Sequence, residues 1–499
     1  MPCRLSKCWA ETFQTRPPEF HYWDSSIVGF KRLTKLRRYM DEDSRLIRGR
    51  DAQRMIVDTA WNMAESVRAT LGPRGMDMML VDRMGNQVLT NDGATILKSI
   101  ETRDPIAKII SEVAKAQEQT AFDGTTTCVI LIGELLRRAD ELIARGVHPN
   151  AIIKGYRVAL SQALETAEKE AISMDSYDAA LKVAQTAMTG KSAEDFVENL
   201  AELCAKAASI AEPSEIKLLT FPGQPKDAEL IEGVVVLKGA LASGMPKEAE
   251  GKVLLLEPEF SPPQAQVTLS DPEKIRAITQ MQTDFLQNRI DKVSELGISV
   301  IFCQRGMDSR VTQYLRKAGI LAFKNIRRSD MRRIASATGA EVITDIADFN
   351  EEDLGEGKVK VGKSANDYAA ITGKDTKSAT ILIPAPTEQS AEEFQRALED
   401  AVGVSYLCTK EPFVVNGAGC IQAQMCSAIK QAKPETNPKV EAARLAYAEA
   451  LMIIPQTLAE SAGMDVMDVT VKMQSDPTLG VDVNNMELTQ MQVFEPLAV

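Results

Sequence analysis

The sequence predicts a multidomain protein in which helix-rich segments at both ends of the chain enclose an α/β insert. Three observations lead to this prediction. The chain has 499 residues, which is more than one hydrophobic core normally holds. Apolar residues recur at helical spacing up to about residue 211 and again from about residue 388. Between these segments, short apolar runs alternate with helical stretches, as is typical of an α/β domain.

The amino-acid composition excludes several classes of function. The hydrophobic fraction of 44% and charged fraction of 26% are ordinary for a soluble globular protein. A net charge of −12 argues against nucleic acid or anionic membranes as partners, and no apolar run reaches the roughly 18–20 residues of a membrane span. Eight scattered cysteines without a CxxC pair indicate reduced thiols and a cytoplasmic location. With only two histidines, catalysis would have to use carboxylates, lysines, backbone amides or a metal.

Residues 1–39 differ in composition from the rest of the chain. They hold two of the three tryptophans, the pair Pro17-Pro18 and a basic cluster within residues 31–38, without helical or strand periodicity. We expect an extension that is disordered or spurious, with Met40 as the true start. A basic arm that binds a partner is the alternative interpretation.

The first third of the chain is expected to contain amphipathic helices and one hairpin. Apolar spacing predicts helices over residues 51–70, 106–121 and 126–145, and alternation predicts hairpin strands over 79–82 and 87–90. A glycine and a proline end the first helix, and a short turn separates the other two.

The middle of the chain is expected to form the α/β insert. A helix over residues 271–297 should open at Asp271-Pro272-Glu273, where an N-cap residue precedes a proline. Strands are predicted over the following runs: 216–221, 233–238, 252–256, 298–303, 320–323 and 341–344.

The strongest chemical signal is the run Asp123-Gly124-Thr125-Thr126-Thr127 at the start of a predicted helix. Free N–H groups and the helix dipole make such a terminus an anion site, and the threonine hydroxyls add donors for phosphate oxygens. Gly124 would let a ligand approach the backbone closely. Asp123 is a candidate Mg²⁺ ligand, because this ion prefers carboxylates beside bound phosphates. A threonine-rich N-cap without a ligand is the alternative.

Two further loops strengthen the phosphate interpretation. Residues 70–75, of sequence TLGPRG, follow a helix, and their glycines and proline suit a backbone wrapped around phosphate. Residues 91–95, of sequence NDGAT, place Asp92 just before another helix. Each loop alone is also compatible with an ordinary turn, but three such loops within about sixty residues indicate one phosphate site.

Residues 357–364 match the GxxxxGK[ST] spacing of a P-loop, which would make Lys363 a phosphate ligand. That motif needs a buried strand before it and a helix after it. Acidic residues precede this segment and a strand-like run follows it, so the alternation of lysine and valine over 358–361 predicts an exposed strand instead.

Taken in this order, the loops resemble those of the group II chaperonins, the archaeal and eukaryotic cytosolic type. The similarity runs from about residue 49 to residue 499. It rests on these segments: GRDAQRM at 49–55, LGPRGMD at 71–77, LVD at 80–82, NDGATIL at 91–97, DGTTT at 123–127, VHP at 147–149, GMPK at 244–247, ATGA at 337–340, IIPQTLAESAGMD at 453–465 and EPL at 495–497.

The resemblance implies three domains. They would comprise an equatorial ATPase domain of residues 40–149 and 410–499, an intermediate domain of 150–215 and 370–409, and an apical substrate-binding domain of 216–369 with a helical lid protrusion. It also implies roles for individual residues. Lys191 would sense the γ-phosphate and Asp123 would hold Mg²⁺. Asp400 would position the attacking water with help from Asp92, and Gly417, Ala418 and Asp482 would lie at the ribose. The residues expected to contact the phosphates are Thr70, Leu71, Gly72, Pro73, Gly93, Gly124, Thr125, Thr126 and Thr127.

The function implied is that of an ATP-driven chaperone. Its subunits would form a homo- or hetero-oligomeric double ring, bind unfolded client proteins and close over them with built-in lids, without a separate cap protein. Three departures from the family pattern stand out: Phe122 and Ala418 replace usual glycines, and Pro384-Ala385-Pro386 stands where RGG is usual. They leave open a second hypothesis, a subunit that binds nucleotide and completes a heteromeric ring without hydrolysing it.

Overall fold

The computed structural model describes residues 48–81, 85, 87–99, 104–191, 196–262, 272–346, 349–363, 367–373, 377–490 and 493–497. The expectations for residues 1–39 and for the cap at Asp271 lie outside these ranges. In the described part of the chain, no helix has both the length and the apolar character that crossing a membrane requires.

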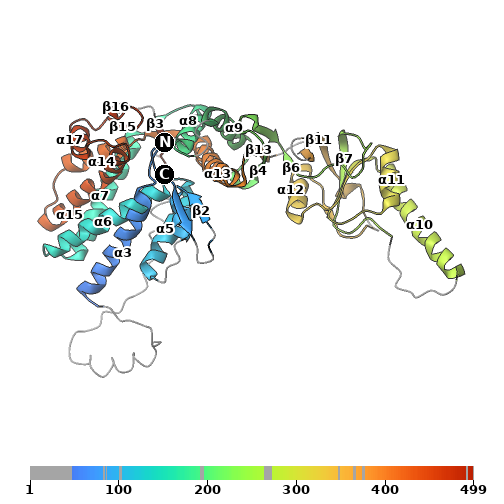
Figure 1. The fold of residues 1–499 in the computed structure, drawn as a ribbon, viewed down its shortest axis with the longest axis horizontal. Coiled ribbons are helices and arrows are strands. Elements are labelled where there is room, and N and C mark those ends of the chain that lie inside the picture. The colour runs from blue at the N-terminus through green and yellow to red at the C-terminus, as the bar shows by residue number, and fades with distance from the viewer. Residues whose placement is uncertain are drawn as a thin grey trace, which may run out of the picture. The chain divides into compact units, whose positions relative to one another are not determined.

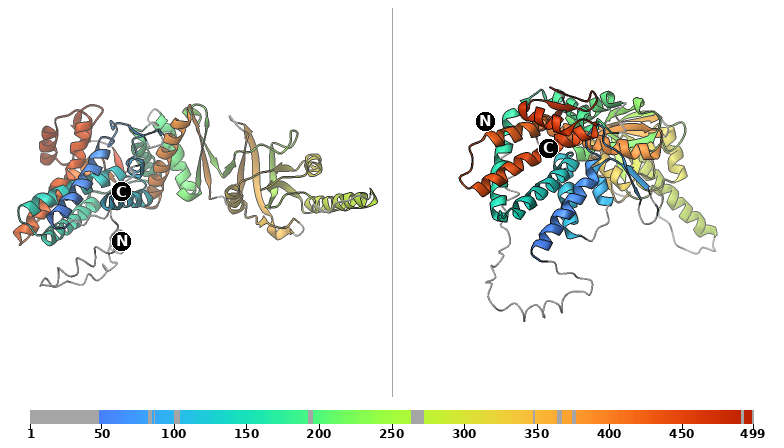
Figure 2. Two further views of the ribbon diagram at one scale, coloured as in Figure 1. Left: turned by 60° about the horizontal axis from the view of Figure 1, so that its bottom comes forward. Right: turned by 60° about the vertical axis from the view of Figure 1, so that its left-hand side comes forward.

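A helical body is built from both halves of the chain, and segments coloured blue and red lie side by side in it (Figures 1 and 2). Its core joins Val67 and Ile130 from the first half to Ile429 and Met473 from the second. Its elements are α3 (Arg50–Arg68), β1 (Met78–Val81), β2 (Gln87–Thr90), α4 (Gly93–Ser99), α5 (Pro105–Ala121), α6 (Thr125–Ala144), α7 (Pro149–Glu170), α14 (Cys420–Gln431), α15 (Pro438–Leu451), α16 (Ile453–Ser461), α17 (Val466–Ser475), β15 (Gly480–Asp482) and β16 (Glu487–Thr489).

Local sequence explains where several of these helices begin. Asp104 caps α5 by accepting a hydrogen bond from the Ile106 N–H at 2.8 Å, and Pro105 occupies the first turn, where no N–H is needed. Asn437 caps α15 in the same way, with Pro438 after it. These caps satisfy donors that would otherwise be left without a partner at the helix start.

A small sheet module follows the helical body in the first half of the chain, and most of its second-half elements come before the helical body resumes at α14. The parallel pair β4–β13 and the antiparallel pair β13–β5 form a three-stranded sheet, which packs through Ile381 and Ile383 against α8, α9 and α13. A second sheet orders its strands β17-β14-β3. The elements are β3 (Ile172–Ser173), α8 (Ser176–Met188), α9 (Val197–Ile210), η2 (Pro213–Glu215), β4 (Ile216–Pro222), η3 (Pro225–Asp227), β5 (Glu229–Glu232), β13 (Ala379–Ala385), α13 (Glu388–Lys410), β14 (Phe413–Asn416) and β17 (Phe494–Pro496).

The α/β insert has its own core around a seven-stranded sheet of order β6-β12-β11-β7-β8-β9, with β10 paired to β7. Phe302 and Phe323 stack in this core with ring centroids 4.8 Å apart. Its elements are β6 (Val234–Val236), β7 (Glu248–Leu256), α10 (Pro272–Glu295), β8 (Ile298–Cys303), α11 (Ser309–Ala318), β9 (Leu321–Phe323), α12 (Arg328–Thr338), β10 (Val342–Ile343), η4 (Glu351–Asp353), β11 (Gly355–Lys363) and β12 (Asp367–Gly373).

The predicted order of helices, α/β insert and helices is therefore confirmed for the described elements. The P-loop interpretation of residues 357–364 is wrong, because the first seven of these residues lie in strand β11, paired with β12 and β7. The prediction of an exposed strand is half right. Lys358 is exposed, but Val359 is buried and β11 lies inside the sheet.

One buried ion pair in the helical body yields a stability prediction. The Arg444 side chain is 1% exposed and is held by Glu441, with Nη2 and Oε1 2.7 Å apart. Glu441→Gln would leave the buried guanidinium without its counter-charge, so we expect a loss of about 2–3 kcal/mol in the free energy of unfolding. Chemical denaturation measures this change.

The exposed pair Lys472–Asp468 provides the control, since both side chains are 58% exposed. Asp468→Asn should cost less than about 0.5 kcal/mol. Equal losses for the two variants would contradict the assignment of Arg444 as a buried charge that depends on Glu441.

Candidate functional site

A cavity of about 600 Å³ lies where the glycine-rich loops meet the small sheet module. The helical body supplies residues 70–73, 91–92, 122–128, 418–419 and 481–484. The small sheet module supplies the polar face of α8, the turn that follows it, Asp400 of α13 and Glu495 of β17. The cavity therefore gathers segments that lie more than 300 residues apart in the sequence.

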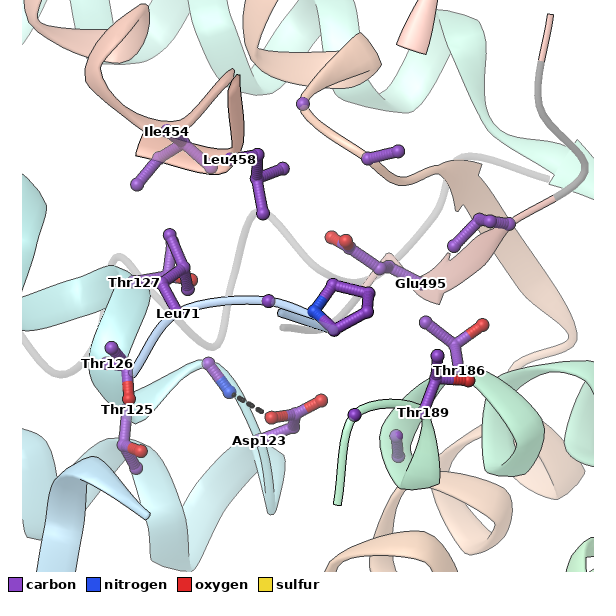
Figure 3. A pocket seen from close by; sticks show the side chains of 18 of the residues that line it. Leu71, Asp123, Thr125, Thr126, Thr127, Thr186, Thr189, Ile454, Leu458 and Glu495 are labelled. Carbon is purple, nitrogen blue, oxygen red and sulfur yellow. Dashed lines mark hydrogen bonds between the residues drawn. The ribbon is translucent and has the colours of Figure 1, made fainter. Parts of the chain in front are cut away.

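The start of α6 opens into this cavity. Gly124 is its N-cap, with φ of 76°, and no side chain caps the helix. Asp123 accepts a hydrogen bond from the Gly124 N–H at 2.7 Å, drawn as the dashed line in Figure 3, where Thr125, Thr126 and Thr127 follow beside it. A 20-residue helix whose first N–H groups lack a side-chain cap is a favourable place for an anion.

Four aspartates line the cavity: Asp92, Asp123, Asp400 and Asp482. Asp92 is fixed at the start of α4, where its Oδ2 accepts hydrogen bonds from the Thr95 N–H at 2.9 Å and the Thr95 hydroxyl at 2.6 Å. Asp400 lies on α13. Burial raises the pKa of Asp400 to about 6, and the charges of Asp123 and Asp92 act in the same direction against the opposing effect of Lys191.

Lys191 is the cation that faces these carboxylates. Its Nζ lies 2.6 Å from Asp400 Oδ2, and the two side chains are 24% and 27% exposed. Burial alone would lower the pKa of Lys191, but the negative charges of Asp400, Asp123 and Asp92 outweigh this effect and raise it. The lysine is therefore charged and already committed to one carboxylate.

Two predicted residues do not line the cavity, Gly93 and Gly417. Instead, they allow close packing beneath it. A Cβ at Gly93 would lie 2.4 Å from Thr126 Oγ1, and a Cβ at Gly417 would lie 2.7 Å from Glu495 Oε1. All the other predicted site residues line the cavity.

Phe122 and Ala418 adopt left-handed backbone conformations, with φ of 60° and 54°. Such a conformation costs an L-residue with a Cβ about 1–2 kcal/mol. The Ala418 carbonyl accepts a hydrogen bond from the Val481 N–H at 3.0 Å, which helps to hold this turn. The two unusual residues thus keep the backbone geometry that a glycine would adopt more easily.

Several residues that line the cavity were not predicted from the sequence. One polar face of α8 contributes Lys182, Gln185, Thr186 and Thr189, and Thr186 and Thr189 lie opposite the threonines of α6 in Figure 3. A polar stripe at helical spacing could have indicated this face, although such stripes more often face solvent.

Glu495 is the most important residue that was missed. It points into the cavity from β17 (Figure 3), and burial, followed by the charge of Asp123, raises its pKa to about 7. Asp482, which was predicted at the ribose, is already engaged. It accepts hydrogen bonds from the Asn484 N–H at 2.9 Å and from the Asn485 side chain at 2.8 Å.

No group of three or more His, Cys, Asp or Glu side chains among the described residues is arranged to hold a metal ion by itself. A magnesium ion in this cavity would need most of its ligands from a bound substrate and water, as is usual for magnesium at phosphates.

The fold and the cavity define a class: a multidomain α/β protein with a cleft that is assembled from separate loops and includes an uncapped helix start. The sequence model of the TCP-1/cpn60 chaperonin family matches residues 63–499. The chain belongs to this family.

Its relatives include thermosome subunits. It is 41% identical to thermosome subunit beta of Archaeoglobus fulgidus, over 90% of this chain and 88% of that protein. It is 40% identical to thermosome subunits of Methanopyrus kandleri and Pyrococcus abyssi, again over 90% of this chain and over 88% and 87% of theirs. The group II chaperonin resemblance found in the loops is therefore confirmed.

The raised pKa of Glu495 predicts a pH-dependent stability in the protein without nucleotide or magnesium. Because the folded-state pKa lies above the unfolded value, the stability from the protonated carboxyl is complete below about pH 4.5 and is lost as the pH rises through 7. Glu495→Gln mimics the protonated form, so its thermal midpoint should exceed that of the wild type more at pH 8 than at pH 5.

Glu165→Gln, on an exposed position of α7, is the control and should show no such gain. A Glu495→Gln advantage of the same size at both pH values would contradict the assignment of a buried, proton-retaining carboxyl.

Proposed function

We propose that this chain is an ATP-driven chaperonin subunit that hydrolyses magnesium-bound ATP in the cavity described above. The observation that carries the proposal is the convergence of Asp400 with Asp123 and the open start of α6 in one cavity. Phosphoryl transfer to water needs little covalent help from a protein. It needs charge neutralisation, an anion cradle and a group that directs the attacking water.

Different residues of the cavity would meet these three needs. The N–H groups at the start of α6, the hydroxyls of Thr125–Thr127 and the loop Thr70–Pro73 would hold the phosphates. Asp123 would hold the magnesium ion together with phosphate oxygens and water. Bound there, that ion would neutralise charge on the phosphates.

Asp400 would accept a hydrogen bond from the attacking water and orient it in line with the γ-phosphate, with Asp92 assisting. Lys191 pairs with Asp400 now and would turn to the γ-phosphate when ATP binds. This exchange of partners would free the Asp400 carboxylate at the moment it is needed. Asp400 comes from α13 rather than from the phosphate loops, so hydrolysis would depend on keeping α13 close to them.

We assign the ribose to the region of Ala418, Asp482 and Glu495. Glu495 is better placed to accept hydrogen bonds from sugar hydroxyls than Asp482, whose carboxylate oxygens already bind Asn484 and Asn485. The turn containing Ala418 would provide the backbone surface beneath the sugar.

We further propose that the helical body is the equatorial ATPase domain, the small sheet module the intermediate domain, and the α/β insert the apical substrate-binding domain with α10 as its lid protrusion. The shared core of β4, β5 and β13 with α9 and α13 favours assigning residues 216–232 to the intermediate domain rather than to the apical one. The partners would be unfolded proteins and further chaperonin subunits in a cytoplasmic double ring, without a separate cap.

A second function is favoured by the strained turns at Phe122 and Ala418. In that case the chain would bind nucleotide and complete a mixed ring without hydrolysing ATP at a useful rate. The carboxylates of Asp92, Asp123 and Asp400 weigh against it, since an inert site has no need of a carboxylate to direct water.

Steady-state ATP hydrolysis by the purified chain separates the two functions. We expect Asp400→Ala to lower kcat by about 100-fold or more with little change in KM, because binding contacts remain while the water-directing group is lost. Asp330→Ala, which removes a carboxylate bonded to Lys217, outside the cavity lining, is the control and should leave kcat unchanged. Equal background rates for wild type and Asp400→Ala would support the non-hydrolysing subunit instead.

A further inference from the structure

Phe122 lies directly before Asp123 and has an unusual environment. It ends α5 in a left-handed conformation, with its N–H bonded to the Glu118 carbonyl at 3.0 Å. Its ring lies against Gly403 of α13. The ring and the proposed magnesium ligand are therefore positioned by adjacent residues of one turn.

The ring fits against Gly403 of α13. A Cβ at position 403 would lie 2.1 Å from Phe122 Cγ and 2.4 Å from its Cβ and Cδ1. Any side chain at 403 would therefore have to displace the ring or the helix. Gly403 follows Asp400 by three residues, so the contact is made almost one helical turn after the water-directing carboxylate.

The ring also packs against the buried cluster that contains Val183 of α8 and Val404 of α13. α8 leads to Lys191, and α13 carries Asp400. Phe122 thus packs against a cluster to which both helices that bring the charged pair into the cavity contribute.

A second contact holds α13 on the other side of Asp400. Arg396 lies one turn before it and donates a hydrogen bond from Nη1 to the Thr90 hydroxyl at 3.0 Å. Asp400 is therefore flanked by a polar contact with the end of β2 and by an apolar contact with the turn before α6.

We infer that Phe122 is a positioning residue: its ring, set in the notch at Gly403, fixes the distance between the Asp400 carboxylate and the Asp123–Thr127 loop. The inference rests on the proposed function, because its effect is on hydrolysis. It predicts that Phe122 and Gly403 act as one unit, so that changing either alters the rate at which bound ATP is hydrolysed rather than how tightly ATP is bound.

A double-mutant cycle tests this. Gly403→Ala in the wild-type background forces α13 away from the ring, and we expect kcat to fall at least about tenfold while KM and the affinity for a non-hydrolysable ATP analogue stay within about twofold. In the Phe122→Gly background the notch is empty, so adding Gly403→Ala should change kcat by less than about twofold.

Gly155→Ala is the matched control, because a Cβ there would lie 2.5 Å from the Val440 carbonyl in the helical body, away from the cavity lining. It should lower the thermal midpoint, leave kcat per folded subunit unchanged and show no rescue by Phe122→Gly. If Gly403→Ala fails to fold, Phe122→Leu replaces it. The shorter side chain should lower kcat about threefold or more at constant analogue affinity.

The inference is overturned if Gly403→Ala or its Phe122→Leu replacement retains the wild-type kcat, or if adding Gly403→Ala lowers kcat by the same factor with and without the ring. Absence of ATP hydrolysis in the wild type would instead reject the proposed function, and the two failures are thereby distinguished.

Discussion

The structure of the site depends on the balance of charge inside one cavity. Six carboxylates line it, together with the lysines Lys182 and Lys191; the carboxylates are those of Asp92, Glu118, Asp123, Asp400, Asp482 and Glu495. Partly buried negative charges that lack enough counter-charge are costly, and the raised pKa values of Asp400 and Glu495 follow from this. A nucleotide would bring further negative charge, so it could enter this cavity only together with a cation. This constraint is the physical reason to propose magnesium-bound ATP rather than a free phosphate ester.

Close backbone approach is the second requirement of the cavity. Gly190 makes this clear, because a Cβ there would lie 2.4 Å from Pro73 Cα. The turn that precedes Lys191 therefore rests directly on the phosphate-compatible loop. The Asn91 side chain donates a hydrogen bond to the Gly190 carbonyl at 3.1 Å and holds the same contact from the other side. Loops from the helical body and the small sheet module are thus interlocked around the space where phosphates would lie.

Much of the fold could be predicted from the sequence, because periodicity and caps are local signals. The helix at Pro105–Ala121 was predicted over 106–121 from its apolar spacing, and β11 follows from alternating lysine and valine. Strand β5 and its pairing with β13 were not predicted, since Glu229–Glu232 is short and gains its apolar contacts only from distant partners. Strand pairing between segments 150 residues apart leaves no local trace.

In the site, too, local features could be predicted from the sequence and long-range ones could not. The open start of α6 could be recognised from DGTTT, because glycine and threonine act on the helix terminus they belong to. The resemblance to a known family supplied Asp400 and Lys191, which no local pattern connects to that loop. Glu495 lies in a short strand near the end of the described chain, and only the three-dimensional structure brings it to the cavity. Its raised pKa is likewise a property of the assembled cavity and not of its neighbours in sequence.

The structure of the protein with magnesium and an ADP–metal fluoride complex that mimics the transferring phosphoryl group would test the central claim most directly. The account predicts the fluoride group at the start of α6, the metal ion on Asp123, and the Asp400 carboxylate within hydrogen-bonding distance of a water in line with that group. A nucleotide bound elsewhere, or Asp400 remote from the fluoride group with α13 withdrawn from the phosphate loops, would contradict it.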